Sequence, residues 1–247
     1  MIELTTLGWA ALAAAALLIG VAKTALPGAG TISVAVFAAV LPARESTAAL
    51  LVLLIVGDLV AVWAYRNEVD VKALLRLIPS VLVGLILGAA FLAYSDDVVM
   101  RRSIGVILLT LTALTLYLMK RGSLRSDDAL TNPKVRGLYG ALGGFTSMAA
   151  NAGGPVMTLY FVAAGFDVMR FIATQAWFFF GINVAKLPFS IGLGLLRPEV
   201  LPVLAILTPL VLVGAFAGKR WVRRFDQRTF TAVVIVLTVL SSLYLLR

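Results

Sequence analysis

The sequence predicts an all-α polytopic membrane protein made of two inverted repeats. The chain of 247 residues is 61% hydrophobic and 13% charged, with a mean hydropathy of +1.02, which is far too apolar for a water-soluble domain of this length. Its apolar segments divide into two halves of five. Each half is interrupted at a matching place by a break that contains glycine and proline, at residues 23–30 and 151–155. Matching breaks in two halves of a membrane chain indicate a substrate site.

The apolar segments have different lengths, and the lengths predict different structures. The third to fifth segments of each half are near the roughly 20 residues needed to cross a bilayer, whereas the first two are mostly shorter and meet at the break. We therefore expect each repeat to be a short broken-helix hairpin followed by three transmembrane helices. The segments cover residues 7–22, 28–41, 46–65, 73–93 and 101–119, then 137–150, 154–166, 171–191, 199–217 and 229–246.

The two halves also align with each other, at an offset that drifts from 124 to 127 residues. This predicts a first transmembrane repeat at 1–119, a polar cytoplasmic connector at 120–136 and a second transmembrane repeat at 137–247. An ordinary helix bundle without duplication is the alternative, because glycine-rich apolar segments resemble one another by composition. The matching residues are Gly20 with Gly144, Gly30 with Gly154, Phe37 with Phe161, Arg44 with Arg170, Gly88 with Gly214, and Leu116-Tyr-Leu118 with Leu243-Tyr-Leu245.

The basic residues predict the orientation. If each short pair makes an even number of crossings, fourteen Lys and Arg residues gather on one side and only five on the other. The basic side is then cytoplasmic, both termini are non-cytoplasmic, and the second half is inverted relative to the first. If each short pair crosses once instead, the chain has eight spans in parallel repeats and the charges divide almost evenly, which is unusual. The fourteen are Arg66, Lys72, Arg76, Lys120, Arg121, Arg125, Lys134, Arg136, Arg170, Lys219, Arg220, Arg223, Arg224 and Arg228.

Composition also excludes several classes of function. The chain has no cysteine and no histidine, which argues against thiol catalysis, disulfides and the usual transition-metal sites. It has no deep pair of carboxylates for acid–base chemistry, so we expect no enzyme, no cofactor and no metal. The net charge of +9 comes from residues that flank apolar segments, so we expect a lipid bilayer as partner and no nucleic acid. The sequence does not indicate an oligomeric state.

The first break has the residues of an oxyanion site. Lys23 lies in apolar sequence, where an interrupted helix leaves unpaired backbone N–H groups and a positive dipole end at the start of the next helix. Glycine lets the backbone approach a ligand, and hydroxyl groups donate hydrogen bonds. The alternative is that Lys23 extends to the membrane interface. The predicted substrate-binding residues of this break are Lys23, Thr24, Gly28, Gly30, Thr31 and Ser33.

The second break predicts a second half-site. Asn151 offers both a donor and an acceptor, Pro155 suits the first turn of a helix, and a hydroxyl follows one turn later. The alternative is a kink between packed helices. The predicted binding residues are Asn151, Gly153, Gly154 and Thr158.

A polar stripe is predicted on the helix over 171–191, where Gln175, Asn183 and Lys186 recur at helical spacing and would complete the substrate site. Asp58 is the one acidic residue deep within a full-length apolar segment. A bare charge at that depth is costly, so Asp58 is predicted to pair with a lysine or to couple a proton. Lys186 is a candidate both for substrate contact and for a salt bridge with Asp58.

Together these residues resemble the sulfite exporter TauE/SafE family of membrane permeases. The resemblance covers nearly the whole chain, and it implies a secondary transporter that exports sulfite or a small organosulfur anion across the inner membrane. An anion channel, or a permease for another small organic anion, is the alternative. The resemblance rests on Gly20-Val-Ala-Lys23, Pro27-Gly-Ala-Gly30, Gly57-Asp58, Gly143-Gly144-Phe145, Gly153-Gly154-Pro155 and Asn183-Val-Ala-Lys186.

Overall fold

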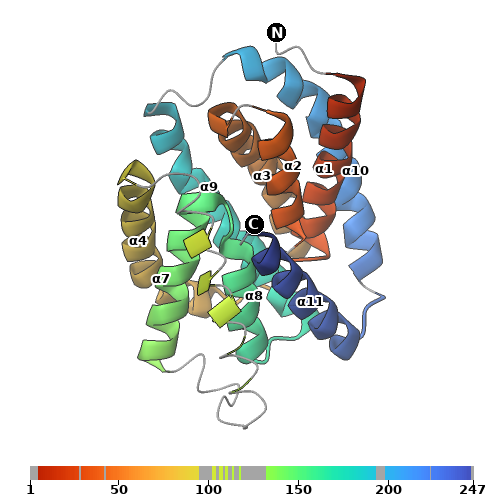
Figure 1. The fold of residues 1–247 in the computed structure, drawn as a ribbon. Helices are drawn as coiled ribbons and strands as arrows, with labels where there is room; N and C mark the ends of the chain where they lie inside the picture. Colours follow the sequence, from red (N-terminus) through yellow and green to blue (C-terminus); the bar gives the residue numbers. More distant parts are fainter. Residues whose placement is uncertain are drawn as a thin grey trace. The chain divides into compact units, whose positions relative to one another are not determined.

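Helices make up all the regular structure in the described part of the chain (Figure 1). The computed structural model describes residues 5–27, 29–41, 43–94, 132–192, 198–222 and 224–245, with isolated positions between 102 and 117. The helices are α1 (Thr6–Thr24), α2 (Gly30–Val40), α3 (Ala43–Tyr65), α4 (Val71–Tyr94), α7 (Pro133–Ala150), α8 (Gly153–Ala163), α9 (Val168–Gly192), the short 3₁₀ helix η1 (Pro198–Val200), α10 (Leu201–Val222) and α11 (Gln227–Leu245).

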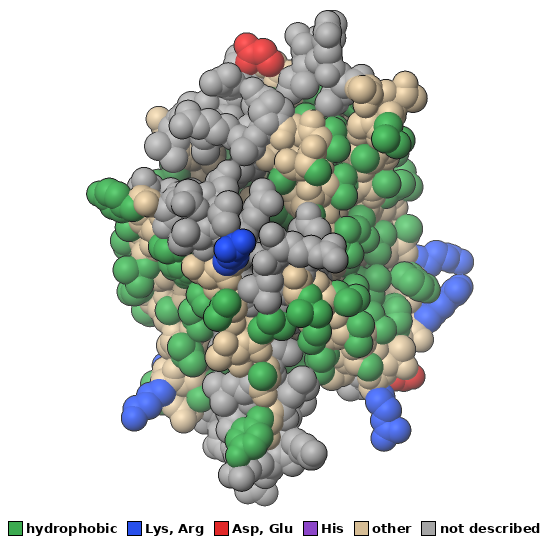
Figure 2. Space-filling view, viewed as in Figure 1, with side chains coloured by type: hydrophobic (Ala, Val, Ile, Leu, Met, Phe, Trp, Pro, Cys, Tyr) green, Lys and Arg blue, Asp and Glu red, His purple; other side chains and the backbone are tan. Residues whose placement is uncertain are grey.

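Four of the described helices are long and apolar enough to cross a membrane, at Thr6–Thr24, Val71–Phe91, Val168–Gly192 and Leu201–Val222. Large apolar side chains on α4 and α10, such as Ile86 and Phe216, are exposed as lipid contact requires. Figure 2 shows a described surface dominated by hydrophobic side chains. The predicted all-α membrane architecture is therefore confirmed, while the segment predicted at 101–119 and the connector fall largely outside the described residues.

The helices end at both predicted breaks. α2 and α8 each have 11 residues, which is short for a span. α1 differs from the expected short segment, because it extends to polar residues at both ends and reaches 19 residues. At the second break, Asn151 adopts φ 52°, a left-handed conformation that asparagine tolerates better than most residues, and this ends α7.

The chain forms two compact units. The first contains α1, α2 and α3, with α10 and the part of α9 from Gln175 onward. Its centre is the packing of α1 against α10. A Cβ at Gly20 would overlap the backbone of Val211 and Ala215, and one at Gly214 would overlap the carbonyl group of Leu17. Glycine at these positions is what allows the two helices to approach so closely.

The second unit contains α4, α7, α8 and α11, with the first turns of α9. Here α4 packs along α7, and glycines again form the crossing. A Cβ at Gly144 would overlap the carbonyl oxygen of Val81, and one at Gly88 would lie 2.7 Å from the carbonyl oxygen of Phe145. A chain of aromatic rings packs beside it, from Tyr139, Tyr160, Phe161, Phe166, Phe171 and Phe230.

Candidate functional site

A buried ion pair lies at the first break. The Nζ atom of Lys23, in the last turn of α1, is 2.7 Å from Oδ1 of Asp58 in the middle of α3. The Asp58 side chain is fully buried, whereas 13% of the Lys23 side chain is exposed. The last turn of α1 is a favourable place for a cation, because the helix dipole is negative there. Helix packing thus holds a positive and a negative charge together in the apolar interior of the first unit.

The residues around the Lys23 stem pack closely against it. A Cβ at Gly57 would lie 2.9 Å from Cγ of Lys23. A side chain at position 57, next to Asp58, would therefore displace the lysine. The Nζ atom also lies 4.9 Å from the centre of the Phe179 ring, a cation–π distance. Asp58, Gly57 and Phe179 therefore fix the position of the Lys23 ammonium.

The polar stripe on α9 reaches the same cluster. The side-chain amide of Asn183 donates a hydrogen bond of 2.7 Å to Oδ2 of Asp58, so both carboxylate oxygens have a neighbour from another helix. Lys186 is buried, at 5% exposure, and its charge interacts with those of Asp58 and Lys23. Gln175 is also buried, and its Oε1 has no hydrogen-bond partner among the described residues.

The other residues of the first break have different roles. The Thr24 hydroxyl lies 3.0 Å from the carbonyl oxygen of Gly20 and 2.9 Å from that of Ala215, and its single hydrogen serves one of them at a time. Ser33 donates to the carbonyl oxygen of Ala15 at 3.0 Å. These hydroxyl groups hold helices together. Among the remaining predicted residues, Thr31 is buried, Gly30 begins α2, and Gly28 lies outside the described residues.

The second break belongs to the second unit. Asn151 ends α7, and Gly153 and Gly154 begin α8. A Cβ at Gly154 would meet no atom within 4 Å, so packing does not require glycine there. The Thr158 hydroxyl is fully buried and has no hydrogen-bond partner among the described residues, which is unusual for a buried polar group.

Neither helix that begins at a break has a side-chain cap. α2 begins after Ala29 and α8 after Ala152, and neither residue has a side chain that can accept from the first N–H groups. Five helices that begin elsewhere differ: Thr5 caps α1, Asn132 caps α7, and aspartates accept from backbone N–H groups at the starts of α4, α9 and α11. The breaks thus combine glycine, uncapped helix starts and, at the first break, a lysine.

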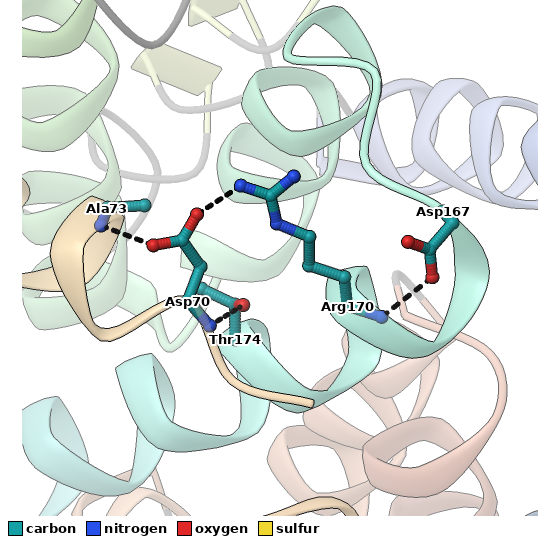
Figure 3. A network of polar contacts seen from close by, with 5 residues as sticks. All are labelled: Asp70, Ala73, Asp167, Arg170 and Thr174. Atoms are coloured by element: carbon teal, nitrogen blue, oxygen red, sulfur yellow. Dashed lines mark hydrogen bonds and ion pairs between the residues drawn. The ribbon is translucent and has the colours of Figure 1, made fainter. Parts of the chain in front are cut away.

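A second ionic network in the second unit joins the segment before α4 to the first turns of α9 (Figure 3). Asp70 accepts from the backbone N–H of Ala73, forms an ion pair with Arg170, and donates its own backbone N–H to the Thr174 hydroxyl. Asp167 in turn accepts from the backbone N–H of Arg170. Burial opposes ionisation of Asp70, but the hydrogen bonds from Arg170 and Ala73 outweigh it, and the pKa of Asp70 lies below its usual value.

Sequence reasoning missed three participants in these clusters. Phe179 lies four residues from both Gln175 and Asn183, so the helical spacing that identified the polar stripe includes it. Tyr65 donates to the backbone carbonyl of Thr24 at 2.9 Å and thus supports the end of α1. Asp70 was overlooked because it lies in a polar loop, where nothing local in the sequence distinguishes a buried network from a solvated turn.

The comparison with known families covers nearly the whole chain. The family model described as "Sulfite exporter TauE/SafE" matches residues 12–245. The chain belongs to the sulfite exporter TauE/SafE family. As a TauE/SafE protein it is a multi-pass membrane protein of a family that transports sulfur anions, and the resemblance predicted from its breaks is confirmed. No curated protein and no solved structure matches the chain.

Proposed function

We propose that this TauE/SafE protein is a secondary transporter that moves sulfite or a small organosulfonate outward across the inner membrane. The family supports a sulfur anion as the transported species, and its description as an exporter supports the direction. Within the chain, the proposal places anion recognition at Lys23, which is the cation that the first break brings into the apolar interior. Asn183 and Lys186 lie around the same cluster and complete its polar lining.

The buried Lys23–Asp58 pair is the observation that carries this proposal. Replacing a buried ion pair with apolar residues is often neutral or favourable, so stability alone is a weak reason to keep charges at membrane depth. An ammonium at a helix break is instead suited to an oxyanion, which it attracts by charge and by hydrogen bonding. The uncapped start of α2 follows within a few residues and supplies backbone N–H groups.

The second break is proposed to be an anion-binding element of its own within the second unit. Its support is the buried Thr158 hydroxyl without a partner, together with an uncapped helix start and a glycine that packing does not require. A hydroxyl of this kind has a hydrogen to donate to a ligand oxygen. Thr158→Val keeps the shape of the side chain and removes only that hydrogen bond, so it should weaken anion binding while changing the melting temperature of the ligand-free protein little.

The proposal is tested by thermal unfolding of detergent-purified protein with sulfite, sulfate, thiosulfate, methanesulfonate, acetate and chloride. A ligand that binds only the folded protein must raise its stability. We expect selective stabilisation by sulfite or methanesulfonate, lost in Lys23→Gln and kept in Lys219→Gln. Lys219 is a matched control, because it is a lysine of the same unit that lies over the Trp63 ring instead. Equal stabilisation of both variants would contradict the assignment of Lys23.

A further inference from the structure

The Lys23 ammonium already has an anionic partner, and this constrains how a substrate anion binds. Asp58 Oδ1 lies at 2.7 Å, within the shell that an oxyanion bound to Lys23 would occupy. The side chain cannot easily turn elsewhere, because Gly57 packs on its stem and the Phe179 ring lies below its head. An incoming anion and the Asp58 carboxylate would be two like charges in one apolar site, which is strongly unfavourable.

Asn183 provides a means of relieving that conflict. Its amide donates to Oδ2 of the Asp58 carboxylate at 2.7 Å. An asparagine amide holds a donor and an acceptor, so by rotating it can accept from a protonated carboxyl group as well as donate to an ionised one. A second lysine or an arginine at position 183 could only donate. Asn183 therefore suits an aspartate that changes its protonation state.

The surrounding charges are few. Lys186 on α9 acts electrostatically on both members of the pair, α2 has no ionisable residue, and the basic residues of α10 are in its last turn, where Lys219 lies over Trp63. Adding one proton to Asp58 and one monovalent anion to Lys23 leaves the net charge of this cluster unchanged. The loaded site then carries the same charge as the empty site.

We propose that a monovalent substrate anion and the Asp58 carboxylate compete for the Lys23 ammonium, so that each anion binds together with one proton on Asp58. This rests on the proposed function of the Lys23 site and specifies its ligand as a monoanion plus a proton. The proton comes from hydronium or buffer acid in the aqueous phase and adds to a carboxylate oxygen of Asp58. The ion pair to Lys23 breaks, and the Asn183 amide turns its oxygen to the new hydroxyl group. Release reverses each step.

The test uses methanesulfonate, because it stays a monoanion throughout the working pH range, whereas sulfite itself titrates. Calorimetric titration of the full-length wild type in buffers of different ionisation enthalpy measures proton uptake directly. We expect one proton taken up per methanesulfonate, and an affinity that falls about tenfold for each unit of rising pH while Asp58 is ionised in the free protein. Binding without proton uptake and without pH dependence would overturn the proposal.

Asp58→Asn removes the competing charge and keeps the shape of the side chain. This variant should bind methanesulfonate at least as tightly as the wild type does at its most favourable pH, with no pH dependence and no proton uptake. Asp226→Asn is the matched control: Asp226 accepts from Thr229 at the start of α11 in an exposed loop, so its replacement should leave affinity and proton uptake unchanged. Weaker binding by Asp58→Asn than by the wild type at every pH would contradict competition.

The outcomes separate this inference from the proposed function. If methanesulfonate binds to the wild type and not to Lys23→Gln, but without proton uptake, the anion site stands and proton linkage fails. If Lys23→Gln binds as the wild type does, the proposed site itself fails. Because proton uptake is measured on the wild type, the inference can be tested even if Asp58→Asn does not fold.

Discussion

The Lys23–Asp58 pair shows how a site residue also determines stability. Asp58 is fully buried and forms an ion pair with Lys23, so removing the lysine alone leaves a buried carboxylate without its nearest counter-charge. Breaking a buried pair in this way costs about 3–5 kcal/mol, whereas removing both charges costs much less. Lys23, which is proposed to bind the anion, is therefore also expected to contribute to the stability of the fold.

A double-mutant cycle tests this coupling. Lys23→Gln should lower the free energy of unfolding by about 3 kcal/mol, and Lys23→Gln/Asp58→Asn should restore much of the loss, because the buried carboxylate is removed together with its nearest counter-charge. Chemical denaturation of the four proteins in detergent measures the coupling. If the effects of the two substitutions on the free energy of unfolding were additive, the coupling energy between Lys23 and Asp58 would be zero, which would contradict this prediction.

Asp70 gives a second prediction at this scale, with a defined pH dependence. Its pKa is lower in the folded protein than its usual value of about 3.9, so its contribution is present above that value and is lost as the pH falls through the folded pKa. We expect Asp70→Asn to reduce stability by about 1 kcal/mol at neutral pH, discounted because 41% of the Arg170 side chain is exposed. Asparagine still accepts from Ala73, so the helix start is kept.

The deficit of Asp70→Asn should shrink in strongly acidic solution, where the wild-type carboxylate is protonated as well. Chemical denaturation of the wild type and of Asp70→Asn at neutral and at acidic pH measures this difference in the free energy of unfolding. A deficit independent of pH would show that the ion pair with Arg170 is not its cause.

At the scale of helices, the glycines divide into two groups. Gly20, Gly214, Gly144 and Gly88 lie where a Cβ would press into a neighbouring helix backbone. By contrast, a Cβ at Gly154 or Gly181 would meet no atom within 4 Å. The first group explains how α1 packs closely on α10 and α4 on α7. At the positions of the second group, packing does not require glycine.

Alanine substitutions should separate these groups. Gly214→Ala and Gly144→Ala should each destabilise the protein by about 1–3 kcal/mol or more, because the obstructing atoms are backbone atoms that cannot rotate away. Gly181→Ala, within α9, should be neutral or stabilise by up to about 1 kcal/mol, because alanine favours helix. Thermal unfolding of the three variants measures the difference, and equal melting temperatures would contradict the packing account.

The positions of helices and breaks were largely predictable from the sequence, because they follow from apolar run length and from glycine and proline. The contacts between residues of the candidate site were harder to predict from the sequence. The pairing of Lys23 with Asp58 joins α1 to α3 and depends on the register of helix packing, which no local pattern contains. The sequence singled out Lys186 as the candidate ion-pair partner of Asp58, whereas in the structure Lys23 forms the ion pair with it.

At the scale of the whole molecule, we propose that the halves are inverted repeats. The glycines that align between halves support this: Gly20 and Gly144 belong to α1 and α7, while Gly214 and Gly88 belong to the helices α10 and α4 that pack on them. In each unit, the first helix of one half thus packs on the fourth apolar segment of the other half. The two units thus repeat the same helix pairing, as a duplicated chain would.

The orientation of the halves can be measured directly, because the chain has no cysteine. Single cysteines at Asn67, Glu199 and Asp226 place a thiol in three connections between the long helices, the second of them in the short helix η1. Inverted repeats predict that Asn67 and Asp226 react with an impermeant reagent from the cytoplasmic side and Glu199 from the other. Parallel repeats predict instead that Asn67 and Glu199 share a side and Asp226 is opposite.

The central claim is that this TauE/SafE protein moves a sulfur anion by binding it at Lys23, and counterflow in proteoliposomes tests it most directly. Vesicles preloaded with unlabelled sulfite are diluted into labelled sulfite. We predict saturable uptake that depends on the internal sulfite, retained in Lys219→Gln and lost in Lys23→Gln reconstituted at the same density. Flux that does not saturate, needs no internal sulfite and persists in Lys23→Gln would contradict the account and indicate a channel-like path elsewhere in the protein.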